Sequence, residues 1–532
     1  MSIPNRNALY GIFAFLLFFA FKPASAQEWI KYYGEGQNAV CHHITNTYDN
    51  GNVIGGMIDN YVFLWIVKTD VNGNILWNKK IGNGINTCSI RNIEQTDDGG
   101  YILCGSTKLI NSTNDAYTIK LNPCAEIEWC KVLDTPDNYD MGIKVKPTQQ
   151  GDFVLMGAYF ATNPISNTSL FKFNSQGDVI WHQFYPLDSI FYQDEPEDLL
   201  IDDSGYLILT DRYFPDPDTT SPPILRHHFT KTDTAGFVAW DLIYGVNEFY
   251  YGDPFSLQIS STGDYYEAGM HLHPNMTASP AFIKISQSGL PLYDADIMSD
   301  SYWGGLSSID LLEDSLLVMV GGYYLDPNVR FHAFFKSDTL GNLLKIKNIP
   351  VASAGYWDVC KSSDNKFTAV GNDFINNSWR IIAVKVNSDL EYDSLYTQPF
   401  SYDSLCPHPI VSETINPTCD NVIVKIDEPF KEPSTTQLRV FPNPSDNLVT
   451  VELPKYLVVN SKGNSGATTI HHQWSKATLQ LIDLQGKIQM QQEVSQSTGS
   501  LQIVVSYLAA GMYQFRLLYQ GKLVAGSKVM VK

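Results

Sequence analysis

Basic residues are scarce in this chain: 36 lysines and arginines face 56 aspartates and glutamates, for a formal net charge of −20. Phosphate backbones repel such a chain, which argues against a nucleic-acid partner. Charges of one sign form no long run, so the sequence contains neither a charged tail nor a polybasic membrane patch. With 13% aromatic residues, 37 glycines and 27 prolines, the composition is that of a globular, turn-rich and strand-rich protein.

The common catalytic and metal-binding signatures are also missing. There is no H-E-x-x-H, no G-x-S-x-G, no P-loop and no pair of C-x-x-C motifs. His271 and His273 would share one face of a strand, but no third ligand lies near them in the sequence. In the pairs His42-His43 and His227-His228, adjacent side chains would point to opposite faces. We therefore expect no metal and no cofactor, and we favour a non-enzymatic protein.

Long hydrophobic runs are absent except near the N-terminus. There, "GIFAFLLFFAF" is too short to span a bilayer comfortably, and Ala-x-Ala precedes Gln27. This pattern predicts a secretory signal peptide over residues 1–26 rather than a membrane anchor. The mature chain is then expected to have no transmembrane segment.

A repeat dominates residues 27–400. The segments "IVKTDVNGNILWNKKIG", "TIKLNPCAEIEWCKVLD" and "FTKTDTAGFVAWDLIYG" each combine a strand, a polar turn and a second strand with a Trp. A Lys column runs in step with the Trp column, and another hairpin precedes each Lys, so one unit is four strands in roughly 52 residues. The Lys column recurs at equivalent positions, which favours a structural role over a catalytic one.

A ring of four-stranded units buries the sheet faces that one unit leaves exposed. The Lys column predicts an all-β, seven-bladed β-propeller, with six or eight blades as alternatives. The extra segment "EWIKYYG" at 28–34 matches an outermost strand and is expected to complete the last blade. The alternative is that "LEYDSLYTQ" fills that place. These repeats resemble quinoprotein-type propellers and secreted Bacteroidota propellers, a resemblance that concerns the fold and not an activity.

Export makes the cysteines candidates for disulfide bonds, although their pairing cannot be deduced from sequence. Cys124 and Cys130 flank a tight turn, so a bridge across that hairpin is one expectation. A second is a bridge between Cys406 and Cys419, which lie in a Pro-rich segment predicted to be a linker over residues 401–434.

Residues 435–532 form a separate pattern of strands and Gly turns, predicted to be a small C-terminal β-sandwich. This segment resembles the type A C-terminal sorting domain of the type IX secretion system. The resemblance is carried by Pro442, Asn443, Pro444, Gly486, Gly511, Tyr513, Lys528 and Lys532. A longer insertion at 455–476 departs from the pattern. The resemblance implies export from the periplasm of a Bacteroidota-like bacterium by that translocon, followed by secretion or attachment to the outer cell surface.

The predicted ligand surface consists of the loops that join one blade to the next. Aromatic residues recur there with neighbouring carboxylates, and such groups suit the faces and hydroxyls of sugars. The alternative is that these rings pack between blades. The function predicted from sequence is a binding or adhesion module for a glycan or protein, with an extracellular carbohydrate-active hydrolase or lyase as the alternative. The residues are Tyr139, Asp140, Tyr192, Asp194, Tyr250, Tyr251, Asp253, Tyr302, Trp303, Tyr356, Trp357 and Asp358.

Overall fold

A computed structural model of the chain describes residues 29–423 and 438–532 apart from short segments. The segments outside the description are 109–113, 135–138, 163–164, 186–192, 215–223, 245–253, 274–276, 300, 352–353, 442–444, 446, 454–456, 464–465, 473–475, 484–486, 496–497 and 520–521. The predicted signal peptide therefore lies outside the described residues. The chain divides into two compact units, Met1–Lys425 and Ile426–Lys532.

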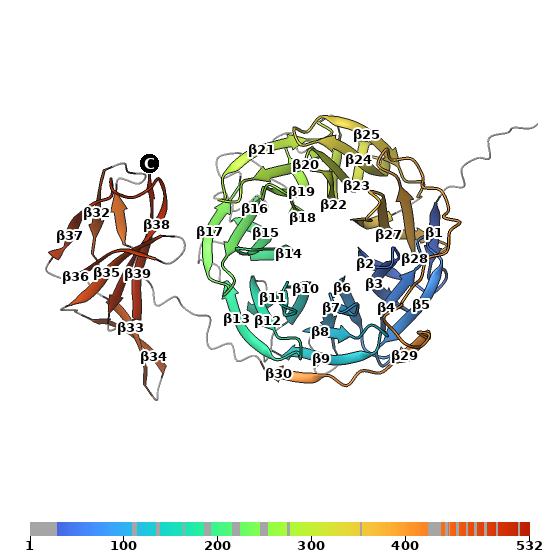
Figure 1. The fold of residues 1–532 in the computed structure, drawn as a ribbon, viewed down its shortest axis with the longest axis horizontal. Helices are drawn as coiled ribbons and strands as arrows, with labels where there is room; N and C mark the ends of the chain where they lie inside the picture. Colours follow the sequence, from blue (N-terminus) through green and yellow to red (C-terminus); the bar gives the residue numbers. More distant parts are fainter. Residues whose placement is uncertain are drawn as a thin grey trace, which may run out of the picture. The chain divides into compact units, whose positions relative to one another are not determined.

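The first unit is a β-propeller (Figure 1) whose described residues form seven sheets around one axis, here called blades 1 to 7. Blade 1 contains β2 (Val40–Asn46), β3 (Asn52–Ile58), β4 (Phe63–Thr69) and β5 (Ile75–Ile81); blade 2 contains β6 (Cys88–Gln95), β7 (Tyr101–Thr107), β8 (Asp115–Leu121) and β9 (Ile127–Asp134). Blade 3 contains β10 (Tyr139–Pro147), β11 (Phe153–Thr162), β12 (Ile165–Phe173) and β13 (Val179–Tyr185); blade 4 contains β14 (Gln193–Asp202), β15 (Gly205–Phe214), β16 (Ile224–Thr232) and β17 (Val238–Ile243). Blade 5 contains β18 (Pro254–Ile259), β19 (Tyr265–Leu272), β20 (Ala278–Ile285) and β21 (Pro291–Asp296); blade 6 contains β22 (Trp303–Glu313), β23 (Leu316–Asp326), β24 (Val329–Asp338) and β25 (Leu343–Asn348). Blade 7 contains β26 (Ala354–Lys361), β27 (Phe367–Ile375), β28 (Ser378–Val386) and β1 (Ile30–Tyr33).

The ring is closed by the N-terminal strand. β1 pairs antiparallel with β28, from Ile30 opposite Val384 to Tyr33 opposite Ile381. The expectation that the segment at 28–34 completes the last blade is therefore confirmed. Trp29, next to this strand, packs in one apolar cluster with residues of blades 1 and 7, so the seam of the ring is also filled by side chains.

The Trp column of the sequence holds neighbouring blades together. The indole of Trp129 donates a 3.0 Å hydrogen bond to the carbonyl of Ser175 in the next blade, and Trp240 donates one of 3.2 Å to Gln287. Each indole lies against a turn glycine, Gly177 or Gly289, where a Cβ would approach the ring to 2.7 Å. Both glycines have a φ of +81°, which other residues rarely adopt. The repeated glycine is therefore required twice, by the turn and by the neighbouring ring.

The Lys column pairs with acidic groups, as its structural interpretation predicts. In blades 1 to 5 each lysine Nζ lies 2.6–3.1 Å from an aspartate carried by a turn of the same blade. The most buried example joins Lys68 to Asp49 at 2.6 Å, with almost no exposed side-chain surface on either residue. Burial lowers the pKa of Lys68 even though Asp49 opposes the shift. A buried charge of this kind is tolerated because its partner is fixed beside it.

Residues 396–423, here called the strap, follow the outer edge of the ring. β29 (Glu413–Ile415) pairs in parallel with β5, and β30 (Asp420–Ile423) pairs in parallel with β9 (Figure 1). The strap begins against blade 1, where the backbone N–H of Tyr396 donates a hydrogen bond to the side-chain oxygen of Asn72. The segment predicted to be a linker over 401–434 therefore pairs with the propeller at 413–415 and 420–423. These residues pair with edge strands whose backbone groups would otherwise be open.

The disulfide pairing also differs from the two expected bridges. Cys124 is bonded to Cys406, and Cys130 to Cys419, so both bridges join the strap to blade 2. The same four cysteines are involved, but the local pairing was wrong because residues separated by 282 and 289 positions in the sequence lie side by side in the ring. Sequence spacing contains no information about that proximity.

Two ion pairs join the strap to the edges that it occupies. Lys79 of β5 stands opposite Glu413 in register and pairs with it at 2.5 Å. Lys131 of β9 stands opposite Asp420 and pairs at 2.7 Å. These ion pairs add to the backbone pairing that holds the strap against blades 1 and 2.

The second unit has a core between two sheets. One contains β31 (Arg439–Phe441), β32 (Leu448–Glu452) and β37 (Ser500–Val504); the other contains β35 (Ala477–Asp483), β36 (Ile488–Val494), β38 (Gly511–Tyr519) and β39 (Lys522–Val531). Val449 and Val451 of the first sheet share one apolar cluster with Leu479, Phe515 and Val529 of the second. The insertion at 455–476 contributes a separate hairpin, β33 (Leu457–Gly463) with β34 (Gly466–His472).

Candidate functional site

The two sides of the propeller are distinguished by their connections. Because strands alternate in direction within a blade, the loops between blades lie on the same side as the turn between the second and third strands. We call this side the crossover face, and the opposite side, with turns such as 233–237, the hairpin face. The predicted aromatic set belongs to the crossover face.

Three rings of the predicted set have described surroundings. Tyr302 and Trp303, at the start of β22, are 46% and 39% exposed, whereas Trp357 is 1% exposed. The indole of Trp357 donates a 2.8 Å hydrogen bond to Nδ1 of His332 in blade 6 and thus joins two blades. The side chains of Tyr139 and Tyr356, and all of Tyr192, Tyr250, Tyr251 and Asp253, lie outside the described residues. The ligand surface predicted for this set stays a prediction.

The predicted carboxylates Asp140, Asp194 and Asp358 are buried inside the blades. Asp194 pairs with Arg212 at 3.0 Å and accepts a hydrogen bond from Thr210. Burial alone would raise the pKa of Asp194, but His228 and Arg212 hold it well below its ordinary value. These acids are placed to stabilise the blades rather than to meet a ligand at the surface.

The innermost strands present a ring of polar groups that the sequence analysis missed. Each of these strands is interrupted by a β-bulge shortly before the residue concerned. The equivalent residues, in blade order, are His43, Asn92, Lys144, Asp198, Ser256, Ser308 and Asp358. No motif in the sequence marked them, because several of these first strands carry other polar residues as well, as β14 does.

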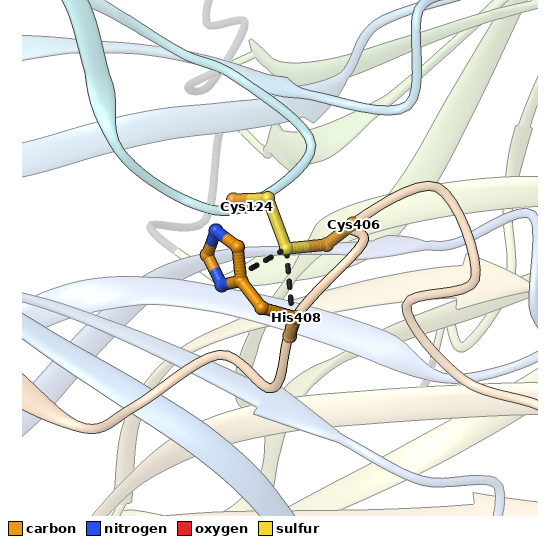
Figure 2. Close-up of side chains that lie close together, drawn as sticks. All are labelled: Cys124, Cys406 and His408. Carbon is orange, nitrogen blue, oxygen red and sulfur yellow. Dashed lines mark hydrogen bonds between the residues drawn. A yellow bond between two sulfur atoms is a disulfide. The ribbon is translucent and has the colours of Figure 1, made fainter.

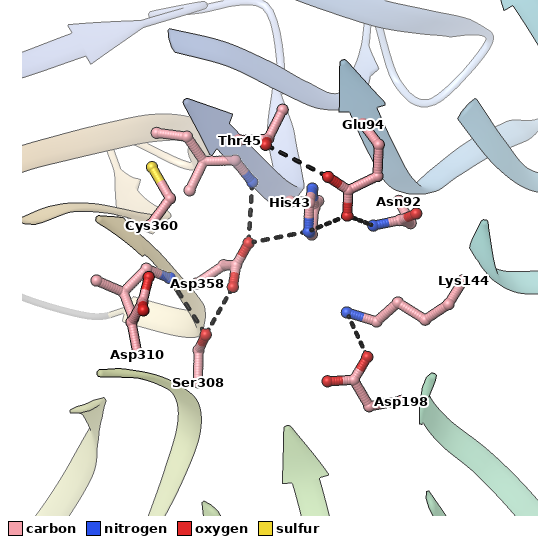
Figure 3. A network of polar contacts seen from close by, with 12 residues as sticks. His43, Thr45, Asn92, Glu94, Lys144, Asp198, Ser308, Asp310, Asp358 and Cys360 are labelled. Carbon is pink, nitrogen blue, oxygen red and sulfur yellow. Dashed lines mark hydrogen bonds and ion pairs between the residues drawn. The ribbon is translucent and has the colours of Figure 1, made fainter. Parts of the chain in front are cut away.

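Several of these residues bind the backbone of the next blade. Asp358 of blade 7, labelled in Figure 3, accepts the N–H of Ile44 in blade 1 at 2.9 Å. Asn92 accepts the N–H of Val145 at 2.9 Å. Asp198 accepts the N–H of Leu257 at 2.8 Å. A bulge leaves a strand N–H without its ladder partner. The side chain of the preceding blade supplies that partner, so this ring is part of the assembly of the propeller.

The charges around the axis are arranged as opposed pairs. Lys146 pairs with Glu94, and Nζ of Lys144 lies 3.4 Å from Asp198. Figure 3 shows His43 between Glu94 and Asp358, with Nε2 3.8 and 3.7 Å from their oxygens. Burial lowers the pKa of His43 although both carboxylates oppose the shift. Burial would raise the pKa of Glu94, but Lys146 and His43 lower it to about 2.

Glu94 should therefore make the stability of the propeller fall on acidification. Its folded-state pKa lies below the ordinary 4.5, so its contribution is present above 4.5 and is lost as the pH falls toward 2. Between pH 4.5 and 2, we expect the free energy of unfolding to fall less in Glu94→Gln than in the wild type. The difference should reach up to about 3 kcal/mol, since one pKa unit is about 1.4 kcal/mol. Urea unfolding at several pH values measures this. The exposed Glu126→Gln is the control, and equal pH profiles for both variants would contradict the assignment.

Histidines gather between blades 4 and 5. His271 and His273 both contact Asp296, at 2.9 and 3.4 Å, so they share one strand face as the sequence indicated. Nδ1 of His227 lies 3.2 Å from Glu267 of blade 5, whereas Nε2 of His228 lies 2.7 Å from Asp241 of its own blade. The neighbouring histidines thus point to opposite sides, as predicted.

One group among the described residues has the spacing of metal ligands: Cys124, Cys406 and His408. Figure 2 shows the two sulfur atoms joined to each other, with the His408 imidazole beside Cys406. A disulfide sulfur lacks the thiolate charge that binds zinc. In this oxidised state the group is part of the attachment of the strap.

Blade 6 carries a row of large side chains across its crossover end. Trp303 of β22 stands opposite Tyr324 of β23, and Tyr324 stands opposite Arg330 of β24. The guanidinium carbon of Arg330 lies 5.7 Å from the Tyr324 ring centre. Leu325 and Val329, in the turn between them, are also exposed. Trp303 was predicted from the sequence, but Tyr324 and Arg330 were not, because they come from a hairpin that only the pairing places beside it.

The predicted sorting residues lie in the second unit. Tyr513 is buried and its hydroxyl donates a 2.9 Å hydrogen bond to the carbonyl of Ala509. Gly511 begins β38, Lys528 is half-buried in β39, and the terminal Lys532 is exposed. Pro442, Asn443, Pro444 and Gly486 lie outside the described residues. The role of each residue in sorting stays a prediction.

Comparison with known families identifies the second unit. Residues 439–532 match the secretion system C-terminal sorting domain. The chain is therefore a β-propeller protein exported by the type IX secretion system to the cell surface or the medium. No helix among the described residues is long and apolar enough to cross a membrane.

Solved structures give no further guide to activity. A Bacteroides caccae protein of unknown function is 12% identical, with a TM-score of 0.34, covering 56% of this chain and 93% of its own. A Dyadobacter fermentans protein of unknown function is 9% identical, with a TM-score of 0.40 and coverages of 56% and 94%. Drosophila Semaphorin 1a is 8% identical, with a TM-score of 0.42 and coverages of 68% and 88%. No curated protein matches the sequence.

Proposed function

We propose that the propeller is an extracellular glycan-binding module whose ligand surface is the crossover end of blade 6. The observation that carries this proposal is the exposure of two adjacent rings, Tyr302 and Trp303, at the inner end of the blade. Exposed aromatic rings lose little conformational entropy on binding and offer flat apolar faces. Sugar rings present matching C–H faces beside hydroxyl groups.

The arrangement around the axis favours binding over hydrolysis. A glycosidase needs two carboxyl groups that are free to face one substrate bond. Asp358 and Asp198 accept backbone N–H groups, and Glu94 is paired with Lys146. An extracellular hydrolase or lyase remains the second candidate. A hydrolysis assay on every glycan that binds distinguishes the two, and product formation would favour the enzyme.

The test is a glycan array probed with the mature secreted protein, followed by affinity measurements on the glycans that bind. We expect Trp303→Ala and Tyr302→Ala each to weaken binding by about tenfold or more, as central aromatic contacts do. Phe237→Ala is the control because Phe237 is 62% exposed but lies on the hairpin face. Unchanged affinity in both blade 6 variants, or capture of a protein ligand with no glycan bound, would contradict the proposal.

A further inference from the structure

The strap binds blades 1 and 2 through one contact that is made twice. Lys79 and Lys131 each stand two residues after the Trp column, on the outermost strand of their blade. Each lies opposite an acid of the strap, Glu413 or Asp420. These two acids are seven residues apart, so the strap advances by seven residues from one blade to the next.

The same contact uses backbone groups that point outward from the edge strand. In blade 1 the N–H of Asn78 donates to the hydroxyl of Ser412 at 3.0 Å. The N–H of Gly82 donates to the carbonyl of Ile415 at 2.9 Å. Backbone groups alternate in direction along a strand, so the outward ones begin one residue after the Trp column and recur at every second residue. An open edge strand offers such groups to any extended segment.

Blades 6 and 7 repeat this edge without a strap. In the register of their blades, Lys347 of β25 and Lys31 of β1 occupy the position that Lys79 has in blade 1. Figure 1 shows both strands on the outer rim of neighbouring blades, and no further strand pairs with either of them among the described residues. Blades 3, 4 and 5 lack the lysine and have instead Gln183, Leu242 and Ala295.

The charge of Lys347 is only partly balanced. Its Nζ lies 3.9 Å from Glu391, an exposed carboxylate whose nearer partner is Lys345 at 2.5 Å. Exposed ion pairs of this kind contribute little stability. The same Nζ lies 3.9 Å from the centre of the Tyr392 ring. Two lysines thus share one carboxylate at the edge of blade 6.

Lys31 has a neutral partner. Its Nζ donates a 3.2 Å hydrogen bond to the amide oxygen of Asn74, and no carboxylate pairs with it in the described part of the chain. The whole chain has a net charge of −20, which repels acidic partners from most of its surface. The neighbouring edges of blades 6 and 7 therefore combine open backbone groups with local positive charge.

We propose that these two edges bind an extended acidic segment of a partner protein, which adds a parallel strand to β25 and to β1 as the strap does to β5 and β9. The segment carries two carboxylates seven residues apart, one opposite Lys347 and one opposite Lys31. Both disulfide bonds hold the chain's own strap on blade 2, so the occupant is a separate chain. The edges lie apart from the glycan surface proposed above, and the inference does not depend on it.

Titration of the mature protein with a peptide of the strap sequence, residues 410–424 with Cys419→Ser, tests the proposal. We expect saturable binding that added salt weakens. Lys347→Gln and Lys31→Gln should each weaken it by about 3- to 10-fold, and the double variant by more than either. Lys80→Gln is the control, because Lys80 lies on the outermost strand of blade 1 and pairs with Asp59.

Two altered peptides separate the edge contact from general attraction between charges. Replacement of both acids by their amides should weaken binding at least as much as the double lysine variant does. Insertion of two residues between the acids keeps the charge but changes the spacing, so only one carboxylate can meet its lysine. This longer peptide should bind the wild type about as weakly as the strap peptide binds a single lysine variant.

Hydrogen exchange locates the bound peptide. The outward amides of β25 and β1 should exchange more slowly when the peptide binds: Ile346, Asn348, Ile30 and Tyr32. Protection of β5 and β9 instead would show replacement of the chain's own strap and would overturn the inference. Binding that ignores the lysine substitutions or the spacing of the acids would overturn it too, as would absence of binding. None of these results bears on glycan binding by Tyr302 and Trp303, so the two proposals fail separately.

Discussion

Removal of residues 435–532 is expected to leave the propeller folded in the periplasm and to reduce its export to background. The sorting domain matches residues 439–532 and has its own core, so its loss removes the export signal without opening the blades. The truncated chain retains the strap and both disulfide bonds, which end at Cys419. Immunoblots of periplasm, cell surface and medium in a type IX-competent host measure the distribution, and protease resistance measures folding.

The hairpin at 457–472 supplies a matched control for this deletion. It pairs only with itself among the described strands, and it lies in the insertion that the sorting pattern does not require. Its replacement by a short Gly-Ser turn should leave export unchanged. Export of the chain without residues 435–532 at the wild-type level would contradict the sorting assignment, whereas unfolding of that chain would contradict the independence of the two cores.

Loss of both disulfide bonds is expected to destabilise the propeller far more than loss of either one. With one bridge intact, the long loop of the ring stays closed, and the missing bridge opens a loop of only roughly 20 residues, worth about 3 kcal/mol. Without either bridge, closure of the long loop is lost as well, and the same chain-entropy model adds about 5 kcal/mol. Urea unfolding of Cys124→Ser, of Cys130→Ser/Cys419→Ser and of the variant with all four substitutions measures this non-additivity.

Trp77 reports whether the strap has left its edge. Its ring is 1% exposed and its indole donates a 3.0 Å hydrogen bond to Asp403 of the strap. We expect a red shift of Trp fluorescence in the variant without disulfide bonds, and none in Glu413→Gln, which loses one ion pair but keeps both bridges. The role assigned to the bridges would be contradicted if the losses in unfolding free energy from removing each bridge simply added up. It would also be contradicted if Trp fluorescence showed no red shift in the variant without disulfide bonds.

Much of the architecture could be predicted because repetition makes it visible in one dimension. The Trp, Gly and Lys columns are imposed by contacts that recur in the blades, such as Trp129 against Gly177 and Lys68 with Asp49. The N-terminal strand could be placed because its sequence matched the outermost strand of the repeat, while no other strands of a blade preceded it. Apolar alternation in the last hundred residues likewise predicted a second core, which Val449 and Phe515 share.

The candidate site could be predicted only in part. Tyr302 and Trp303 belong to a loop whose position in the repeat was known, whereas Tyr324 and Arg330 join them through strand pairing. The polar residues around the axis were also missed. Their partners are backbone groups released by bulges in the next blade, and a bulge depends on local register rather than on residue type.

The sequence by itself determined the all-β class, the repeat and the sorting signal, because each depends on local patterns of side chains, and it favoured closure of the ring by the N-terminal strand. Only the tertiary structure decided the course of the strap and the pairing of Cys124 with Cys406 and of Cys130 with Cys419. These features depend on which distant segments the closed ring brings together. Closure fixes those distances through the packing of all the blades at once, and no short stretch of sequence encodes them.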